Sequence, residues 1–155
     1  MMAHDISPED CPIDQEIITQ YLPHRDPILL VDRVFSYNED NITTELVLSK
    51  HPDLFKGHFP DRAILPGIYM IEMAAQAGAL LVNLSDGVAD GYFIGFAGVD
   101  NVKFKSPVQP DDIIHVQVAI VRRRGSIYKF KGRVTVDNKL AVSLDFTASL
   151  MKFSG

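Results

Sequence analysis

Apolar and polar residues alternate along three segments of the C-terminal third, residues 114–121, 128–136 and 140–150. The turns between these segments carry Arg124-Gly125-Ser126 and Asp137-Asn138-Lys139, which are typical of chain reversals. A period of two gives each β-strand one buried face and one solvated face. The pattern therefore predicts three consecutive strands that pair as antiparallel neighbours.

Nearer the N-terminus, residues 28–37 and 42–49 are rich in β-branched and aromatic residues. The sequence Asn38-Glu39-Asp40-Asn41 between them favours a turn, so these two segments predict a β-hairpin. Upstream, residues 13–22 favour a short amphipathic helix with Asp14 placed to cap it.

One long helix is predicted between the two β regions, from Pro66-Gly67 to about Asn83. Proline suits the first turn of a helix, where its missing N–H has no partner to lose. This helix has almost no polar face, so it must be enclosed. Its apolar positions are Ile68, Met70, Ile71, Met73, Ala74, Ala75, Ala77, Leu80, Leu81 and Val82. We therefore expect an α+β fold in which a curved antiparallel sheet of five to seven strands wraps one central helix.

The composition is that of a globular protein, with 46% hydrophobic and 23% charged residues in a chain of 155. We expect a flexible leader over residues 1–12 and a single domain over residues 13–155. A net charge of −5 argues against a nucleic-acid partner.

The apolar stretch 64–84 is interrupted by Glu72 and Asn83, which argues against a membrane span. The lone cysteine and the absence of a secretory pattern favour a cytoplasmic location.

Two polar side chains interrupt the apolar helix. Glu72 and Gln76 lie one turn apart on the same face. Burying a carboxylate is costly, so this Glu indicates either proton transfer or a structural hydrogen bond, and the helix alone does not choose between them. A second candidate, His58, stands just before the helix in a Gly57-His58-Phe59-Pro60 loop, where its imidazole could act as a base. The remaining histidines rank lower because none shares a motif with a second catalytic residue type: His4, His24, His51 and His115.

Taken together, Gly57-His58-Phe59-Pro60, Pro66-Gly67 and the Glu72/Gln76 pair closely resemble the active-site signature of the FabZ-type β-hydroxyacyl-ACP dehydratases. Residues 22–34 resemble the opening segment of that family, and residues 102–112 resemble its later strand and turn. The three motifs occur in the family's order, and the resemblance covers roughly residues 15–152.

The resemblance implies a hot-dog fold and a homodimer whose two sheets join, with a trimer of dimers as a common larger assembly. It implies two active sites at the dimer interface, each pairing His58 of one subunit with Glu72 of the other. The implied reaction dehydrates a (3R)-3-hydroxyacyl thioester on acyl carrier protein to the trans-2-enoyl thioester, in fatty-acid or related polyene or polyketide biosynthesis. Neither a metal nor another cofactor is implied.

Each residue of the signature then has an expected role. His58 would remove the C2 proton, and Glu72 would assist loss of the C3 hydroxyl. Gln76 would orient Glu72 or a water molecule beside it. The backbone N–H of Gly67, at the positive end of the helix, is placed to polarise the thioester carbonyl, and a glycine there would let the substrate approach closely. Phe59 completes the expected substrate-binding set.

Two alternatives stay open at this stage. The chain could be a hot-dog thioesterase, or a catalytically silent acyl-binding partner subunit. Asp61 and Asp111 stand where glycine is usual in the family, so the loop near His58 could differ. An acidic carrier protein would need a local basic patch, for which the candidates are Lys103, Lys105, Arg122, Arg123, Arg124, Lys129, Lys131 and Arg133.

Overall fold

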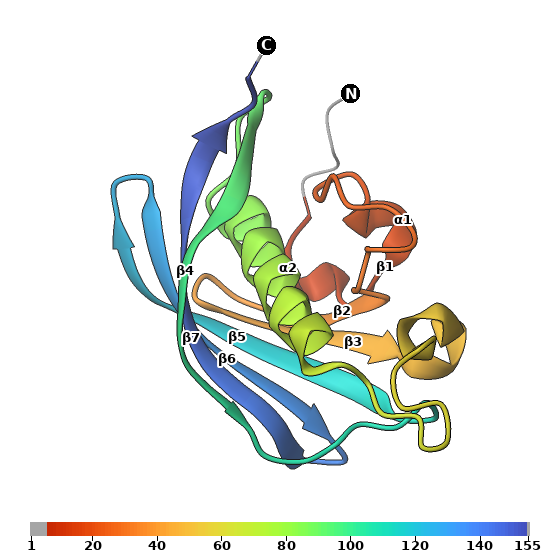
Figure 1. Ribbon diagram of the computed structural model, residues 1–155. Coiled ribbons are helices and arrows are strands. Elements are labelled where there is room, and N and C mark those ends of the chain that lie inside the picture. The colour runs from red at the N-terminus through yellow and green to blue at the C-terminus, as the bar shows by residue number, and fades with distance from the viewer. Residues whose placement is uncertain (1–5, 155) are drawn as a thin grey trace.

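A computed structural model describes residues 6–154 of the chain. Its seven-stranded antiparallel sheet curves around one long helix, α2 (Gly67–Ser85), as Figure 1 shows. The strands follow the order β1-β2-β3-β5-β6-β7-β4 across the sheet. Their bounds are β1 (Ile13–Asp14), β2 (Arg33–Tyr37), β3 (Asn41–Val47), β4 (Tyr92–Phe104), β5 (Ile113–Arg124), β6 (Ile127–Val136) and β7 (Lys139–Lys152). The predicted α+β architecture of a sheet around a helix is confirmed.

The predicted C-terminal strands are also confirmed. β5, β6 and β7 pair as consecutive antiparallel neighbours, with Val118 opposite Gly132 and Gly132 opposite Leu144. On β5, the inward residues Ile114, Val116, Val118 and Ile120 are all buried. The two-residue turn between β6 and β7 places Asp137 and Asn138 at φ values of 49° and 64°, a conformation that tight hairpins require.

Small residues allow α2 to lie close to the concave face of the sheet. The buried rings of Phe130 and Phe146 stack with their centroids 4.6 Å apart. A Cβ added at Gly78 would lie 2.9 Å from Phe146 Cζ, so only a glycine fits over this stack. By length and composition alone α2 could cross a membrane. In this structure it is instead the central helix of the core.

The N-terminal segment departs from the prediction. Residues 13–22 do not form one helix, because Ile13 and Asp14 pair with β2 as the edge strand β1. Helix α1 covers only Gln15–Ile18, and Asp14 makes no side-chain capping bond. Main-chain pairing along the edge of the sheet therefore outweighs the local helical preference. The apolar side chains still reach the core, since Ile13, Ile18 and Leu22 are all buried.

Part of the expected leader, residues 1–5, lies outside the described residues. Within residues 6–12, a short 3₁₀ helix, η1, spans Pro8–Asp10. The Tyr37 hydroxyl donates a hydrogen bond to the Ile6 carbonyl at 3.1 Å, and Ile6 packs against the core.

The alternating pattern did not predict β4 over residues 92–101. Among the described residues this strand pairs with β7 alone, through two register shifts, and its other edge has no partner strand. It also exposes large apolar side chains, among them Phe96, Val99 and Phe104. An edge strand with apolar residues on exposed surface lacks the one-face burial that produces a period of two.

An ion pair anchors the loop that leads to His58. This loop contains two 3₁₀ helices, η2 (Leu48–Lys50) and η3 (Pro52–Phe55). Between them, His51 Nε2 lies 3.0 Å from Asp32 Oδ1, and the other carboxylate oxygen, Oδ2, accepts the Val47 N–H at 2.8 Å. Burial opposes ionisation of Asp32, but the bonds from His51 and Val47 outweigh it and lower the pKa of Asp32. Asp32, the residue immediately before β2, therefore holds the loop in place.

We predict that Gly78→Ala destabilises the protein although alanine is the better helix former. Helix propensity alone would add about 1 kcal/mol to the free energy of unfolding. The new methyl group would overlap the Phe130/Phe146 stack, and such overpacking costs about 1–3 kcal/mol. Urea unfolding at fixed protein concentration should therefore show a net loss. In a Phe146→Leu background the same change should become neutral or stabilising. Stabilisation of the wild-type background would contradict the packing argument.

We predict that Asp32→Asn lowers stability at pH 7 and reduces its dependence on acid. Because the folded-state pKa of Asp32 is depressed, its contribution is present above the ordinary aspartate pKa near 4 and is lost as pH falls through the folded-state value. The difference in unfolding free energy between pH 7 and pH 3 should be smaller in the variant than in the wild type. Asp53→Asn is the control, since Asp53 is exposed and pairs only with Lys56. Equal effects of the two variants would refute the assignment.

Candidate active site

The His58 loop fixes the imidazole in one orientation. Its Nδ1 lies 2.8 Å from the carbonyl oxygen of Ile64, and the backbone N–H of His58 donates to the Phe55 carbonyl at 3.3 Å. A carbonyl oxygen can only accept, so Nδ1 carries the ring proton of the neutral imidazole and Nε2 is left with a free lone pair. His58 is therefore arranged to take up a proton at Nε2.

Phe59 follows in a strained conformation. Its φ of 51° lies in the left-handed region, which costs a bulky residue about 1–3 kcal/mol. The centroid of its ring lies 4.5 Å from the centroid of the His58 imidazole, and Phe59 is 60% exposed. Strain of this kind persists where the surrounding structure holds it, and it is concentrated at functional sites.

Helix α2 begins beside this loop, at Pro66-Gly67. The Gly67 N–H lies in the first helical turn, where no intrahelical acceptor exists and the positive end of the helix dipole is located. A Cβ added to Gly67 would overlap the ring of Phe104. Close packing of the Phe104 ring therefore favours a glycine at this position; the approach of a substrate to Gly67 stays a prediction.

Gln76 is the buried polar residue at the middle of α2, with an exposed fraction of 1%. Its Oε1 accepts the Leu30 N–H at 2.8 Å, while its Nε2 donates to the Ile28 carbonyl at 2.7 Å and to Glu72 Oε1 at 2.9 Å. Both amide protons and the carbonyl oxygen are therefore satisfied, so the amide has one orientation. Gln76 in turn holds the Glu72 carboxyl group, as the one-turn spacing predicted.

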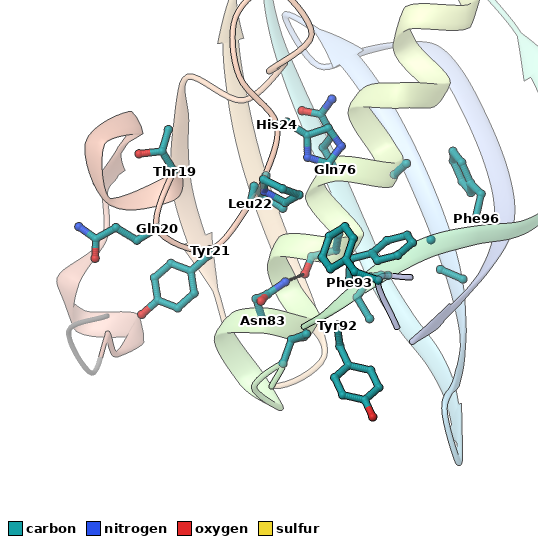
Figure 2. Close-up of a pocket in the computed structure, with 18 of the residues that line it drawn as sticks. Thr19, Gln20, Tyr21, Leu22, His24, Gln76, Asn83, Tyr92, Phe93 and Phe96 are labelled. Atoms are coloured by element: carbon teal, nitrogen blue, oxygen red, sulfur yellow. Dashed lines mark hydrogen bonds between the residues drawn. The ribbon is translucent and has the colours of Figure 1, made fainter. Parts of the chain in front are cut away.

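Glu72 faces a cavity of about 540 Å³. The cavity lies between α2, the segment after α1 and the beginning of β4, and Figure 2 shows His24 and Gln76 on one side of it and Phe93 and Phe96 of β4 on others. Its volume falls in the range of small-molecule sites, and its walls combine aromatic rings with a few polar groups. The Glu72 side chain is 30% exposed, so it can be reached from the cavity.

His24 lies next to Glu72, although its sequence context made it a weaker catalytic candidate than His58. Its Nε2 lies 3.7 Å from Glu72 Oε1, and the residue lines the same cavity. Burial lowers the pKa of His24, an effect that the Glu72 carboxylate opposes and Arg25 reinforces. The only sequence signal was its place in the family-like segment 22–34, because proximity to Glu72 depends on how that segment folds back on α2.

The signature residues fall into two groups within one chain. Glu72 and Gln76 line the cavity, whereas His58, Phe59 and Gly67 are not among its lining residues. Outside both groups, His51 bonds Asp32 and His115 bonds Glu45. His4 lies outside the described residues.

Two further expectations can be compared with the structure. Asp61 and Asp111, which replace the family's usual glycines, both have φ values outside the left-handed region, so neither position requires glycine here. Over residues 6–154, no group of three or more His, Cys, Asp or Glu side chains is arranged to hold a metal ion.

Solved structures share the fold of this chain. The dehydratase heterocomplex ApeI:P from Xenorhabdus doucetiae superposes with a TM-score of 0.75 at 19% identity, covering 87% of this chain and 91% of that one. A thioesterase from Pseudomonas aeruginosa superposes with a TM-score of 0.67 at 14% identity, covering 91% and 96%. At these identities the likeness concerns the fold alone, and it confirms the predicted hot-dog fold.

Sequence comparison identifies the family. The model of the ApeI-like family, described as ApeI dehydratase, matches residues 35–145. The 3-hydroxyacyl-(acyl-carrier-protein) dehydratase FabZ of Rhizorhabdus wittichii is 40% identical over 141 residues, covering 90% of each chain. The FabZ of Aromatoleum aromaticum is 41% identical over 145 residues, covering 92% of this chain and all of that one. This chain therefore belongs to the FabZ and ApeI-like family of hot-dog 3-hydroxyacyl thioester dehydratases.

Proposed function

We propose that His58 and Glu72 carry out the dehydration, on a (3R)-3-hydroxyacyl group presented by acyl carrier protein. The observation that carries this proposal is the hydrogen bond from His58 Nδ1 to the Ile64 carbonyl, which leaves Nε2 as a base. The FabZ relatives support the substrate class, because their names specify the carrier-bound hydroxyacyl group. A cytoplasmic location is consistent with such a partner.

The reaction needs three groups, and the signature supplies each of them. His58 Nε2 removes the C2 proton while the N–H of Gly67 stabilises the negative charge that develops on the thioester oxygen. Glu72 donates its proton to the C3 hydroxyl, which leaves as water as the C2–C3 double bond forms. The turnover leaves His58 with one proton more and Glu72 with one fewer, so both must exchange protons with the surroundings before the next cycle.

A homodimer would complete the site. His58 is not among the residues that line the cavity of Glu72. The chain exposes apolar side chains on β4, in the His58 loop and at the start of α2 that a second copy would cover: Phe96 (39% exposed), Val99 (38%), Phe104 (57%), Phe59 (60%) and Ile68 (67%). Long apolar edge strands are normally paired or covered. Joining two β4 edges would let His58 of one subunit act with Glu72 of the other, and a trimer of dimers is the larger assembly that we expect.

The basic candidates for carrier docking are not equivalent. Arg123 is engaged by Asp40 and Asp86, and Lys131 lies 3.6 Å from Asp145. The other six have no ion pair among the described residues and are better suited to an acidic partner: Lys103, Lys105, Arg122, Arg124, Lys129 and Arg133.

We predict that His58→Ala and Glu72→Gln each lower kcat by about 10²- to 10⁴-fold, the usual contribution of a general acid or base. The assay follows the conjugated enoyl thioester from 3-hydroxyacyl-ACP by absorbance and mass spectrometry. His115→Gln is the control, because His115 bonds Glu45 in a pair that is not part of the cavity lining. A free acid product would instead indicate a thioesterase. Acyl binding without turnover would indicate a silent partner subunit.

The same two variants test whether the site is shared. If the two inactive variants are mixed, unfolded and refolded together, half of the dimers contain one chain of each kind. In a shared site, one of the two sites in such a dimer has both wild-type residues, so about a quarter of wild-type activity should return. A site built within one chain would recover no activity.

We predict that Gln76→Met lowers both stability and kcat. Methionine has a similar volume but leaves the Leu30 N–H and the Ile28 carbonyl without partners, which costs about 2–4 kcal/mol in the free energy of unfolding. Glu72 also loses its donor, so kcat should fall at temperatures where the variant is folded. Gln117→Met, at an exposed position of β5, is the matched control for urea unfolding and turnover. Unchanged kcat in folded Gln76→Met would remove Gln76 from the site.

A further inference from the structure

Among the described residues, two polar side chains contact the Glu72 carboxyl group, and one of these two can change its charge near neutral pH. Gln76 donates an amide proton to Glu72 Oε1 from a fixed orientation. His24 Nε2 approaches the same oxygen at 3.7 Å. Since an amide neither gains nor loses a proton near neutral pH, His24 is the neighbour that can change the charge next to Glu72.

The environment of His24 favours a proton on Nε2. Its Nδ1 is buried and has no hydrogen-bond partner among the described residues. A neutral imidazole carries one N–H, and burying an unpaired N–H donor is costly. The N–H therefore belongs on Nε2, directed toward the Glu72 carboxylate.

The neighbouring Arg25 holds His24 in place without competing for Glu72. Its guanidinium donates to the carbonyls of Leu22 and His24, both at 2.7 Å, and to that of Thr19 at 3.0 Å. These bonds close the turn that carries His24. From the opposite walls of the cavity, the other titratable residues are Asp90 and Tyr92, and Tyr21 lies on the segment that carries His24.

We propose that His24 is a positioning residue for the dehydration, whose Nε2–H and the Gln76 amide together hold the Glu72 carboxyl group directed at the substrate hydroxyl. This inference rests on the proposed role of Glu72 as the acid. It adds a consequence for pH. When His24 takes up a second proton, its positive charge stabilises the ionised form of Glu72, which cannot donate a proton to the leaving hydroxyl.

Protonation of His24 and protonation of His58 lower the activity in the same direction. Because burial lowers the pKa of His24, the residue is neutral at pH 7 and becomes charged only below its ordinary value. His58 must also be neutral to act as a base. Two protonations therefore reduce activity on the acid side, so the limiting slope of log kcat/KM against pH should be about 2 instead of 1.

Two substitutions separate the contact that His24 makes with Glu72 from the change in its charge with pH. His24→Ala removes the contact between Nε2 and the Glu72 carboxyl group, and kcat should fall about tenfold while KM changes less than about twofold. In His24→Gln the amide nitrogen takes the place of Nε2 as a donor but does not titrate. Its kcat should stay near that of the wild type, and the acid-side slope of its kcat/KM profile should fall to about 1.

The controls make each outcome informative. His115→Gln should leave both kcat and the acid-side slope unchanged. Thermal melting checks that the variants are folded, and if His24→Ala does not fold, the slope of His24→Gln still decides. Wild-type kcat in His24→Ala, or an unchanged steep slope in His24→Gln, would overturn the inference. Inactive His58→Ala and Glu72→Gln alongside such results would leave the proposed function intact, whereas activity in those two variants would overturn the proposed function itself.

Discussion

The side-chain amide of Gln76 links three parts of this protein. It is buried in the middle of an apolar helix, where an unsatisfied amide would cost several kcal/mol. The main chain at Ile28 and Leu30 satisfies it from one side and Glu72 from the other. The segment after α1 must therefore run alongside α2, and this brings His24 to the cavity. The position of the Glu72 carboxyl group, one cavity wall and the course of the N-terminal segment all depend on this one group.

His58, the proposed base, is held by a different set of bonds. His58 is fixed by the Ile64 carbonyl, and its loop is anchored to the sheet by the Asp32–His51 pair. Phe59 in the same loop adopts a strained left-handed backbone conformation. The proposed base and the proposed acid thus have separate supports, one in the loop before α2 and one on α2 itself. A reaction that removes a proton from C2 and water from C3 needs a base and an acid on a substrate held between them, which fits supports of this kind.

The fold itself does not select the chemistry. Thioesterases and a dehydratase complex share the same sheet and helix at less than 20% identity. What marks this chain as a dehydratase is the family to which its sequence belongs, together with a histidine whose Nε2 is free and a carboxyl group held by an amide. Those features depend on few residues, so one scaffold can serve several reactions of acyl thioesters.

The sequence alone determined the elements whose burial is periodic and local. The alternation in β5, β6 and β7 and the apolar run of α2 each reflect one continuous buried face, so both could be predicted. The signature also singled out His58, Gly67, Glu72 and Gln76 as candidates, because they lie close together in one contiguous region of the sequence; their catalytic roles stay a prediction. Tertiary structure decided what depends on distant neighbours. Pairing along the sheet edge made Ile13 and Asp14 a strand instead of part of a helix. β4 has no period of two, because among the described residues its outer edge has no partner strand and its apolar side chains are exposed. Phe104 packs on Gly67 from far along the chain, and His24 comes close to Glu72 only through the fold.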